Sequence, residues 1–213
     1  MRKTAIIFDL DNCLAPATAV GQALLEPAFE AVRAVNHGTL AASHLEDALA
    51  DCWVHAFDWV ARTHEFSAEM FDAGWAVMRT LEVEGPMKGY EDLPELDKLH
   101  ARRFLVTSGF RRLQTSKVRA LGIGQLFERV VIDAIDEPER VGKQEIFEQI
   151  LADSGLSADE VLVVGDNPES EIVAGNRLGI MTIQTLRPGI RYSPEATGHV
   201  DSIAGLKPLL QAD

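Results

Sequence analysis

Two aspartates with one residue between them, Asp9 and Asp11, end the first apolar segment of the chain. Two carboxylates this close repel each other unless a cation or a proton lies between them. The pattern alone is weak evidence, because 15 aspartates in 213 residues give about one such pair by chance. Its position says more, since it directly follows a short run that is typical of a buried strand. The alternatives are a turn or a pair of helix-capping carboxylates.

Further polar positions follow apolar segments in the same way. Thr107, Ser108 and Gly109 come after one such run. Asp166 directly follows another, and Lys143 stands at the start of a predicted helix. Each has an ordinary explanation when considered alone, such as a helix cap or a surface lysine. Together, a hydroxyl, an ammonium group and further carboxylates favour a single functional site.

The apolar runs before these residues predict strands that alternate with helices. Each run is short and rich in β-branched residues, and the predicted strands are 3–9, 103–107, 129–133, 161–165 and 181–186. Most of the intervening helices end at a glycine suited to a left-handed residue, and they are predicted at 92–101, 111–121, 143–154 and 168–178. This alternation predicts an α/β fold, a Rossmann-like parallel sheet with helices on both faces.

The segment between the first two strands differs in character. Residues 18–81 carry no strand signal, and their amphipathic patterns predict helices at 19–35, 41–62 and 67–81. We therefore expect two domains. A core domain of residues 1–15 and 87–213 holds the sheet, and a helical domain of residues 16–86 is inserted after the first strand.

The predicted topology brings the polar positions together. In an open parallel sheet, ligands bind beyond the carboxyl ends of the strands. Asp9, Thr107 and Asp166 all stand at such ends, and Lys143 follows the third predicted strand of the core. We therefore expect these side chains to converge on one crevice.

At these residues the sequence resembles the haloacid dehalogenase-like hydrolase superfamily, in the form whose helical cap follows the first strand. Four segments match the order and spacing of that family's motifs: Ile7–Leu14, Leu105–Gly109, Lys143 with the residues after it, and Val163–Glu171. The tail His199–Leu206 also resembles the family's terminal strand and helix. The predicted helical domain matches the family's cap in its position only.

The resemblance implies a reaction mechanism. Asp9 would attack phosphorus and form an aspartyl-phosphate, while Asp11 would protonate the leaving oxygen and later deprotonate water. Mg²⁺ is the implied cofactor, held by the carboxylates of Asp9 and Asp166, the backbone carbonyl of Asp11 and waters. The implied phosphate-binding residues are Leu10, Thr107, Ser108 and Lys143.

The second aspartate distinguishes between reactions of this superfamily. Halide release needs no proton from an acid, and the dehalogenases lack this aspartate, so Asp11 favours a phosphate ester. We expect a small-molecule phosphorylated metabolite as substrate, because a helical cap leaves little room for a polymer. The alternatives are a phosphomutase or phosphotransferase that acts on a sugar phosphate, and a non-catalytic scaffold that retains the fold.

Four positions depart from the family's pattern, and one of them is Gln144, which follows Lys143 where proline is frequent. Asn12 stands where glycine is commonest, and Cys13 stands where threonine is usual, although a thiol is the weaker hydrogen-bond donor. Glu171 replaces the second aspartate of the fourth motif, and we expect it to act on the metal through water or from outside the ligand set. None of these changes removes a group that the chemistry requires.

Charge and composition narrow the classes of partner. The formal net charge of −13 repels the phosphate backbone of nucleic acid. We see no apolar stretch long enough for a signal peptide or a membrane span, and two unclustered cysteines suit a reducing compartment, so we expect a cytoplasmic protein. The scattered apolar residues of the helical domain are compatible with a monomer or a weak homodimer.

Several residues of the helical domain have ordinary structural interpretations. No two of the six histidines combine metal-ligand spacing with a cysteine or carboxylate cluster, so a zinc site is not expected. His55, Arg62 and His64 could meet the substrate, although exposed surface is the simpler interpretation. The packed interior of the domain is expected to include Trp53, Phe57, Trp59 and Val60.

Overall fold

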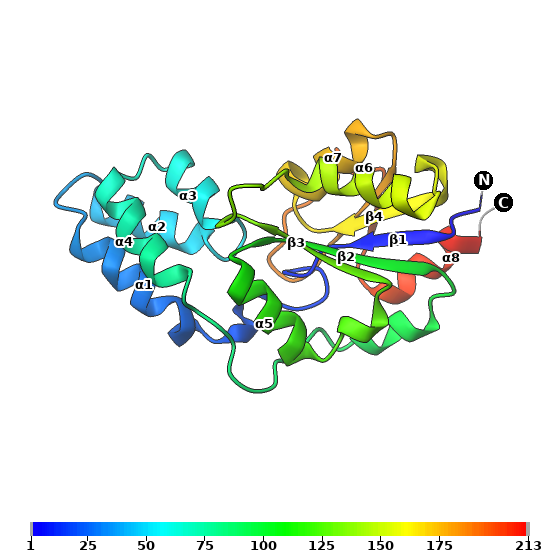
Figure 1. The fold of residues 1–213 in the computed structure, drawn as a ribbon, viewed down its shortest axis with the longest axis horizontal. Coiled ribbons are helices and arrows are strands. Elements are labelled where there is room, and N and C mark those ends of the chain that lie inside the picture. The colour runs from blue at the N-terminus through cyan, green and yellow to red at the C-terminus, as the bar shows by residue number, and fades with distance from the viewer. Residues whose placement is uncertain (1, 212–213) are drawn as a thin grey trace.

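A six-stranded parallel sheet forms the centre of the protein in the computed structural model, which describes residues 2–211 (Figure 1). The strand order is β3-β2-β1-β4-β5-β6, and every neighbouring pair is parallel. The first strand therefore lies inside the sheet rather than at an edge. The strands are β1 (Ala5–Phe8), β2 (Arg102–Gly109), β3 (Arg129–Ala134), β4 (Val161–Gly165), β5 (Met181–Thr185) and β6 (Gly198–Val200).

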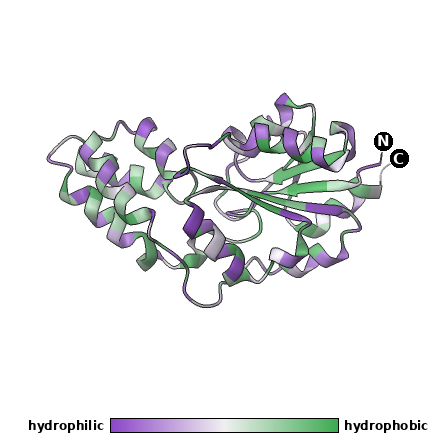
Figure 2. Ribbon diagram, in the orientation of Figure 1, coloured by the Kyte–Doolittle hydropathy of each residue, from purple (hydrophilic) through white to green (hydrophobic). Residues whose placement is uncertain are grey.

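The alternation of side chains along the strands divides the apolar core of the sheet into two layers. Ile6 and Phe8 of β1 belong to one layer, and Ala5 and Ile7 belong to the other. All four side chains are buried. Because both faces of the sheet are covered, β1 is a continuous apolar run rather than an alternating one. Figure 2 shows the same property as apolar strands between helices of mixed hydropathy.

Helices cover both faces of the sheet (Figure 1). One layer is closed by α5 (Arg111–Leu121) and α8 (Lys207–Gln211), which contribute residues to the same core as Ile6. The other is closed by α6 (Lys143–Ser154) and α7 (Val173–Arg177). The predicted Rossmann-like α/β fold is thus confirmed.

Four helices between β1 and β2 form a lobe at one end of the molecule (Figure 1). Its apolar interior includes residues from α1 and α4 and continues into Phe110 and Leu113 beside the sheet. The lobe and the sheet region therefore share apolar packing as well as two chain crossings. The helices are α1 (Gln22–Ala34), α2 (Ala42–Asp51), α3 (Phe57–Thr63) and α4 (Ala68–Met78).

The sequence pattern predicted a single helix at 41–62, which is wrong, because the chain leaves the helix at residues 52–56. This segment contacts the sheet region through its backbone. Asn12 Nδ2 donates to the carbonyl oxygen of Trp53 at 3.1 Å, and Asn167 Nδ2 donates to that of Val54 at 3.3 Å. Such long-range contacts are not encoded in local periodicity, which explains why the break was not predicted.

Two other predicted helices differ from the structure in their geometry. The region predicted as helix 92–101 is a 3-10 helix over Leu93–Lys98. The predicted helix 168–178 begins with one π-type turn, Pro168–Ile172, before α7. The bounds of α5, α6 and β4 agree with the prediction. Further 3-10 turns lie at Ala17–Val20, Gly124–Leu126, Ala158–Glu160 and Ile203–Leu206.

The helices of the protein are short. A membrane span needs about 20 apolar residues, whereas α1 has 13 residues. Within residues 2–211, no helix has the length and apolar character to cross a membrane.

The packing of α4 against α1 leads to a stability prediction. A Cβ atom at Gly74 would lie 2.4 Å from Phe57 Cζ and 2.8 Å from Val32 Cγ2. Alanine normally stabilises a helix over glycine by roughly 0.5–1 kcal/mol, but overlap with buried side chains costs about 1–3 kcal/mol. We therefore expect Gly74→Ala to lower the free energy of unfolding in urea by about 1–2 kcal/mol.

The matched control is the reverse change at the exposed Ala76 of the same helix. Ala76→Gly should cost only the ordinary helix preference of about 0.5–1 kcal/mol. A Gly74→Ala variant as stable as the wild type would contradict the tight approach of α4 to Phe57.

Candidate active site

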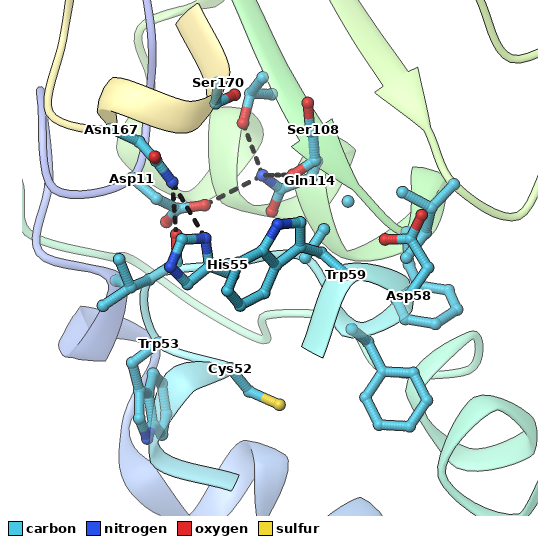
Figure 3. Close-up of a pocket in the computed structure, with 18 of the residues that line it drawn as sticks. Asp11, Cys52, Trp53, His55, Asp58, Trp59, Ser108, Gln114, Asn167 and Ser170 are labelled. Carbon is cyan, nitrogen blue, oxygen red and sulfur yellow. Dashed lines mark hydrogen bonds between the residues drawn. The ribbon is translucent and has the colours of Figure 1, made fainter. Parts of the chain in front are cut away.

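The carboxyl ends of the central strands open onto one cavity of about 260 Å³ (Figure 3). Asp9 follows β1, Asp166 follows β4, and Thr107 and Ser108 lie near the end of β2. Parallel strands present these ends at the same edge of a sheet, which is why the residues meet. All the predicted site residues line the cavity except Leu10, whose side chain is buried in the apolar core.

Three carboxylates and one ammonium group form the centre of the site. Asp9, Asp166 and Glu171 each offer a carboxylate oxygen, and these oxygens lie within 4.8 Å of one another. Lys143 Nζ donates to Asp9 Oδ1 and to Glu171 Oε2, both at 2.8 Å. All four side chains are buried. One lysine cannot neutralise three carboxylates, so the group has an excess of negative charge when all three are ionised.

Burial and mutual repulsion raise the pKa values of the carboxyl groups of Asp9 and Asp166. Burial, together with the neighbouring Glu171, raises the pKa of Asp9 to about 7, although Lys143 opposes the shift. Burial, together with the neighbouring Glu171 and Asp9, raises the pKa of Asp166 well above its ordinary value. Burial alone would lower the pKa of Lys143, but Asp9 and Glu171 outweigh it and raise that pKa. The lysine therefore stays charged, whereas the carboxylates lack a second cation.

This donor set suits a hard divalent cation. Mg²⁺ and Ca²⁺ take oxygen ligands, and carboxylates are their usual protein ligands. Among residues 2–211, the group of Asp9, Asp166 and Glu171 is where three such side chains converge. Glu171, for which the sequence predicted an indirect role, therefore lies among the candidate ligands, and the Asp11 carboxylate lies outside the group.

The π-type turn and a glycine bring Glu171 into the site. Asn167 caps this turn, since its Oδ1 accepts from the backbone N–H of Glu169 at 2.9 Å. The backbone N–H of Asn167 donates to Glu171 Oε1 at 2.6 Å. A Cβ atom at Gly165 would lie only 2.3 Å from the same oxygen. The Glu171 carboxylate therefore occupies the space that a side chain at position 165 would fill.

The Asp11 carboxylate is held by α5. Lys117 Nζ donates to both of its oxygens, at 2.9 and 2.8 Å. Gln114 Nε2 donates to Oδ2 at 3.0 Å (Figure 3). Gln114 Nε2 also donates to Thr107 Oγ1 at 2.6 Å. Lys117 and Gln114 are both buried. One face of this helix thus connects the Asp11 carboxylate to the end of β2.

Neither Lys117 nor Gln114 was singled out from the sequence. They are three residues apart, so they lie on the same face of a helix, next to the apolar Leu113 and Val118. A lysine on the apolar face of an amphipathic helix is rarely buried unless it is paired. The position of Lys117 therefore indicates a buried partner, but only the tertiary fold identifies that partner as Asp11.

A second polar chain runs from Ser108 to the helical lobe. Ser108 Oγ donates to Asp133 Oδ2 at 2.8 Å, and Arg140 donates to both oxygens of Asp133 at 2.9 Å. Arg140 Nη1 also donates to Asp58 Oδ2 of α3 at 2.5 Å. The Ser108 hydroxyl is therefore already engaged, and the implied phosphate contact of this residue rests on its backbone N–H.

Aromatic residues of the lobe form the opposite wall of the cavity (Figure 3). The rings of His55 and Trp59 stack at 3.7 Å between centroids, and Asn167 Nδ2 lies 3.2 Å from His55 Nδ1. Burial lowers the pKa of His55. His55 and Arg62 thus line the cavity, for which exposed surface was the simpler expectation. Phe57 is buried in the lobe as predicted, but Trp59 is half-buried at the cavity.

Comparison with known proteins gives a consistent family. The family described as haloacid dehalogenase-like hydrolase matches residues 3–179. A glyceraldehyde 3-phosphate phosphatase of Pyrococcus abyssi (strain GE5 / Orsay) is 27% identical over 196 residues, which are 84% of this chain and 79% of that one. The pyrimidine 5'-nucleotidase YjjG of Escherichia coli (strain K12) is 29% identical over 61% of this chain and 57% of its own length.

Solved structures are similar in fold. A HAD phosphatase from Thermococcus onnurineus superposes with a TM-score of 0.67 at 18% identity, covering 99% of both chains. The HAD-hydrolase YfnB of Bacillus subtilis, solved with bound magnesium, superposes with a TM-score of 0.65 at 17% identity, covering 100% of both chains. At these identities the likeness concerns the fold, including the lobe after the first strand.

The excess negative charge leads to a stability prediction. Because the pKa of Asp166 is raised, its ionised form is disfavoured in the folded state, and stability falls as pH rises above the ordinary carboxyl pKa. Asp166→Asn removes the charge with little change in shape. We expect the variant to melt at a higher temperature than the wild type at pH 8 in EDTA. The melting temperature should rise by about 2–4 °C for each kcal/mol gained in the free energy of unfolding.

Addition of a divalent cation should reverse that order. An ion that binds only the folded state stabilises the wild type, whereas the variant has lost a ligand and gains less. Thermal unfolding followed by circular dichroism measures both effects. The control is Asp72→Asn, at an exposed position of α4. It should change neither the melting temperature in EDTA nor the increase that the cation causes. A lower melting temperature for Asp166→Asn in EDTA would contradict the electrostatic argument.

Proposed function

The chain belongs to the haloacid dehalogenase-like hydrolase family, and on this basis we propose that it is a phosphatase that hydrolyses a small-molecule phosphate monoester. The observation that carries the proposal is the buried group of Asp9, Asp166, Glu171 and Lys143, with Asp11 in the same cavity. Phosphate esters are also the substrates named for the phosphatase and nucleotidase relatives.

We propose Mg²⁺ as the cofactor, with Asp9 and Asp166 as ligands together with the Asp11 carbonyl. The clustered carboxylate oxygens and the raised pKa values of Asp9 and Asp166 support this assignment. Glu171 is a further candidate ligand. The bound ion supplies charge that screens the two anions that must meet, the nucleophile and the phosphate.

Asp9 is the proposed nucleophile. One of its oxygens forms a bond to phosphorus while the bond from phosphorus to the ester oxygen breaks, and the product is an aspartyl-phosphate. Lys143 lies 2.8 Å from Asp9 Oδ1, so its fixed ammonium group can neutralise the equatorial oxygens as charge develops. Thr107 and the backbone N–H groups of Leu10 and Ser108 are the other proposed phosphate-binding groups.

Asp11 is the proposed proton carrier. The electron pair of the broken bond leaves on the ester oxygen, which takes the proton from Asp11. The resulting carboxylate is the species that Lys117 and Gln114 hold, since both carboxylate oxygens accept hydrogen bonds. In the second step the same carboxylate takes a proton from the water that attacks the aspartyl-phosphate. Lys117 thus stabilises the anion between the two steps.

We propose that residues 16–86 act as a cap over a core of residues 1–15 and 87–213. The aromatic wall of His55 and Trp59 faces the carboxylates across the cavity, so the leaving group would lie between the two. A cavity of about 260 Å³ is slightly smaller than the range of roughly 300–1,000 Å³ for drug-sized ligands. A small phosphorylated metabolite fits this space better than a polymer.

The proposal predicts the outcome of an assay with p-nitrophenyl phosphate. The wild type should hydrolyse it with Mg²⁺ and not with EDTA, and Asp9→Asn should lose at least about 10³-fold in kcat because the nucleophile is absent. Asp72→Asn is the matched control and should keep full activity. Activity that survives Asp9→Asn would contradict the nucleophile assignment, and a magnesium-saturated wild type that is inactive on a broad panel of phosphate esters would contradict the proposed function.

The contact between Lys117 and Asp11 leads to a separate prediction. Lys117→Met should slow hydrolysis of an alkyl phosphate by about 10²-fold or more, because Asp11 loses the contacts that position its carboxyl group, and an alkoxide cannot leave without the proton that Asp11 supplies. Hydrolysis of p-nitrophenyl phosphate should fall much less, since p-nitrophenolate leaves readily unprotonated. Lys117→Arg should restore most of the alkyl phosphate activity. Equal losses with both substrates would mean that Lys117 acts only on the structure.

A further inference from the structure

Two histidines of the helical lobe, His44 and His64, face each other outside the group of carboxylates. His44 lies in the first turn of α2, and His64 directly follows α3. His64 Nδ1 lies 3.3 Å from His44 Nε2, and the other ring nitrogen, His64 Nε2, lies 2.8 Å from Asp51 Oδ2. The three residues are separated by up to 20 positions in sequence, and the fold of the lobe brings them together.

The distance between the two nitrogens fits a shared metal ion. At 3.3 Å the two ring nitrogens lie within hydrogen-bonding distance of each other, and the same separation allows both to bind one metal ion. Two imidazole ligands of a tetrahedral ion with metal–nitrogen distances near 2.0–2.1 Å are separated by about 3.3–3.4 Å. The rings are also inclined at 66° with centroids 5.4 Å apart, so neither stacks on the other.

Asp51 prepares His64 to act as a ligand. Metal-binding histidines almost always donate their second ring N–H to a carboxylate or carbonyl, which fixes the tautomer and the ring orientation. A proton on His64 Nε2, donated to Asp51, leaves the lone pair on Nδ1, the nitrogen that faces His44. Asp51 thus contacts one ring nitrogen of His64, and the other ring nitrogen is left to bind a metal ion together with His44.

The site is open to ions in solution. His44 is exposed, and the Asp51 side chain is 44% exposed, whereas the His64 side chain is only 14% exposed. The packed His64 provides a fixed ligand and the exposed His44 provides access. Two protein nitrogens leave the remaining coordination positions to water, which predicts an exchangeable ion rather than a permanent structural one.

We propose that His44 and His64 bind a borderline transition-metal ion such as Zn²⁺, Ni²⁺ or Cu²⁺ on the helical lobe, with Asp51 orienting His64. Imidazole suits these ions, and carboxylate oxygens suit Mg²⁺. The two sites would therefore prefer different ions, because the site at the sheet offers oxygen ligands and the site on the lobe offers nitrogen ligands. The argument for this site does not rest on the phosphatase activity proposed above.

The ion would connect the two helices that flank the segment at residues 52–56. His44 belongs to α2, and His64 ends α3, whose residues Asp58, Trp59 and Arg62 line the cavity. A ligand that binds only the folded lobe stabilises it by mass action. Occupancy would thus fix α3, and with it the aromatic wall of the cavity, relative to α2.

The experiment uses the full chain in excess Mg²⁺, which occupies the oxygen ligands. One equivalent of Cu²⁺ is added, and its electron paramagnetic resonance spectrum reports nitrogen ligands directly, while Ni²⁺ and Zn²⁺ are titrated by calorimetry. The wild type should bind one ion through two imidazole nitrogens. Asp51→Asn should weaken binding by about 10-fold or more.

The histidine variants decide the outcome. His44→Gln and His64→Gln should each lose the two-nitrogen signal, and His37→Gln, a change at an exposed histidine elsewhere on the lobe, should retain it. Because His44 is exposed, His44→Gln is expected to fold, which circular dichroism checks. A wild type without a two-nitrogen copper signal, or a His44→Gln variant that retains it, would overturn the proposal.

Discussion

The burial of three carboxylates around a single lysine is the constraint on which the rest of this structure depends. Asp9, Asp166 and Glu171 are all removed from water, and Lys143 alone opposes their repulsion. Such a group persists only where the backbone fixes its members, and the ends of two central strands in a covered sheet provide that rigidity. A fully buried part of the fold thus holds its least favourable charges, a relation expected of a functional site.

Local sequence pattern was sufficient to predict the elements that carry this group. Buried runs such as β4 and helices such as α6, which ends at Gly155, have strong local signals, and their predicted bounds agree with the structure. The polar positions at strand ends followed from topology, because parallel strands share one edge. The cap of the turn after Asp166 was likewise predictable from Asn167 followed by proline.

What sequence pattern missed depends on contacts between distant residues. Lys117 and Asp11 are 106 positions apart, and nothing near either residue identifies the other as its partner. The same holds for His44 and His64, whose spacing resembles no metal motif but whose helices contact each other in the lobe. The break in the predicted helix 41–62 has the same cause, since the chain there follows contacts with the core rather than its own periodicity.

The contacts between the lobe and the sheet region separate the position of the cavity wall from its side chains. Asn12 and Asn167 bind the backbone carbonyls of Trp53 and Val54, which are present whatever the side chains are. Asn12 adopts φ = 54°, a conformation that asparagine tolerates better than most residues. The segment at residues 52–56, which lines the cavity, is thus anchored by its main chain. Its side chains, including His55, can therefore set the shape of the cavity without disturbing the carboxylates at the ends of the strands.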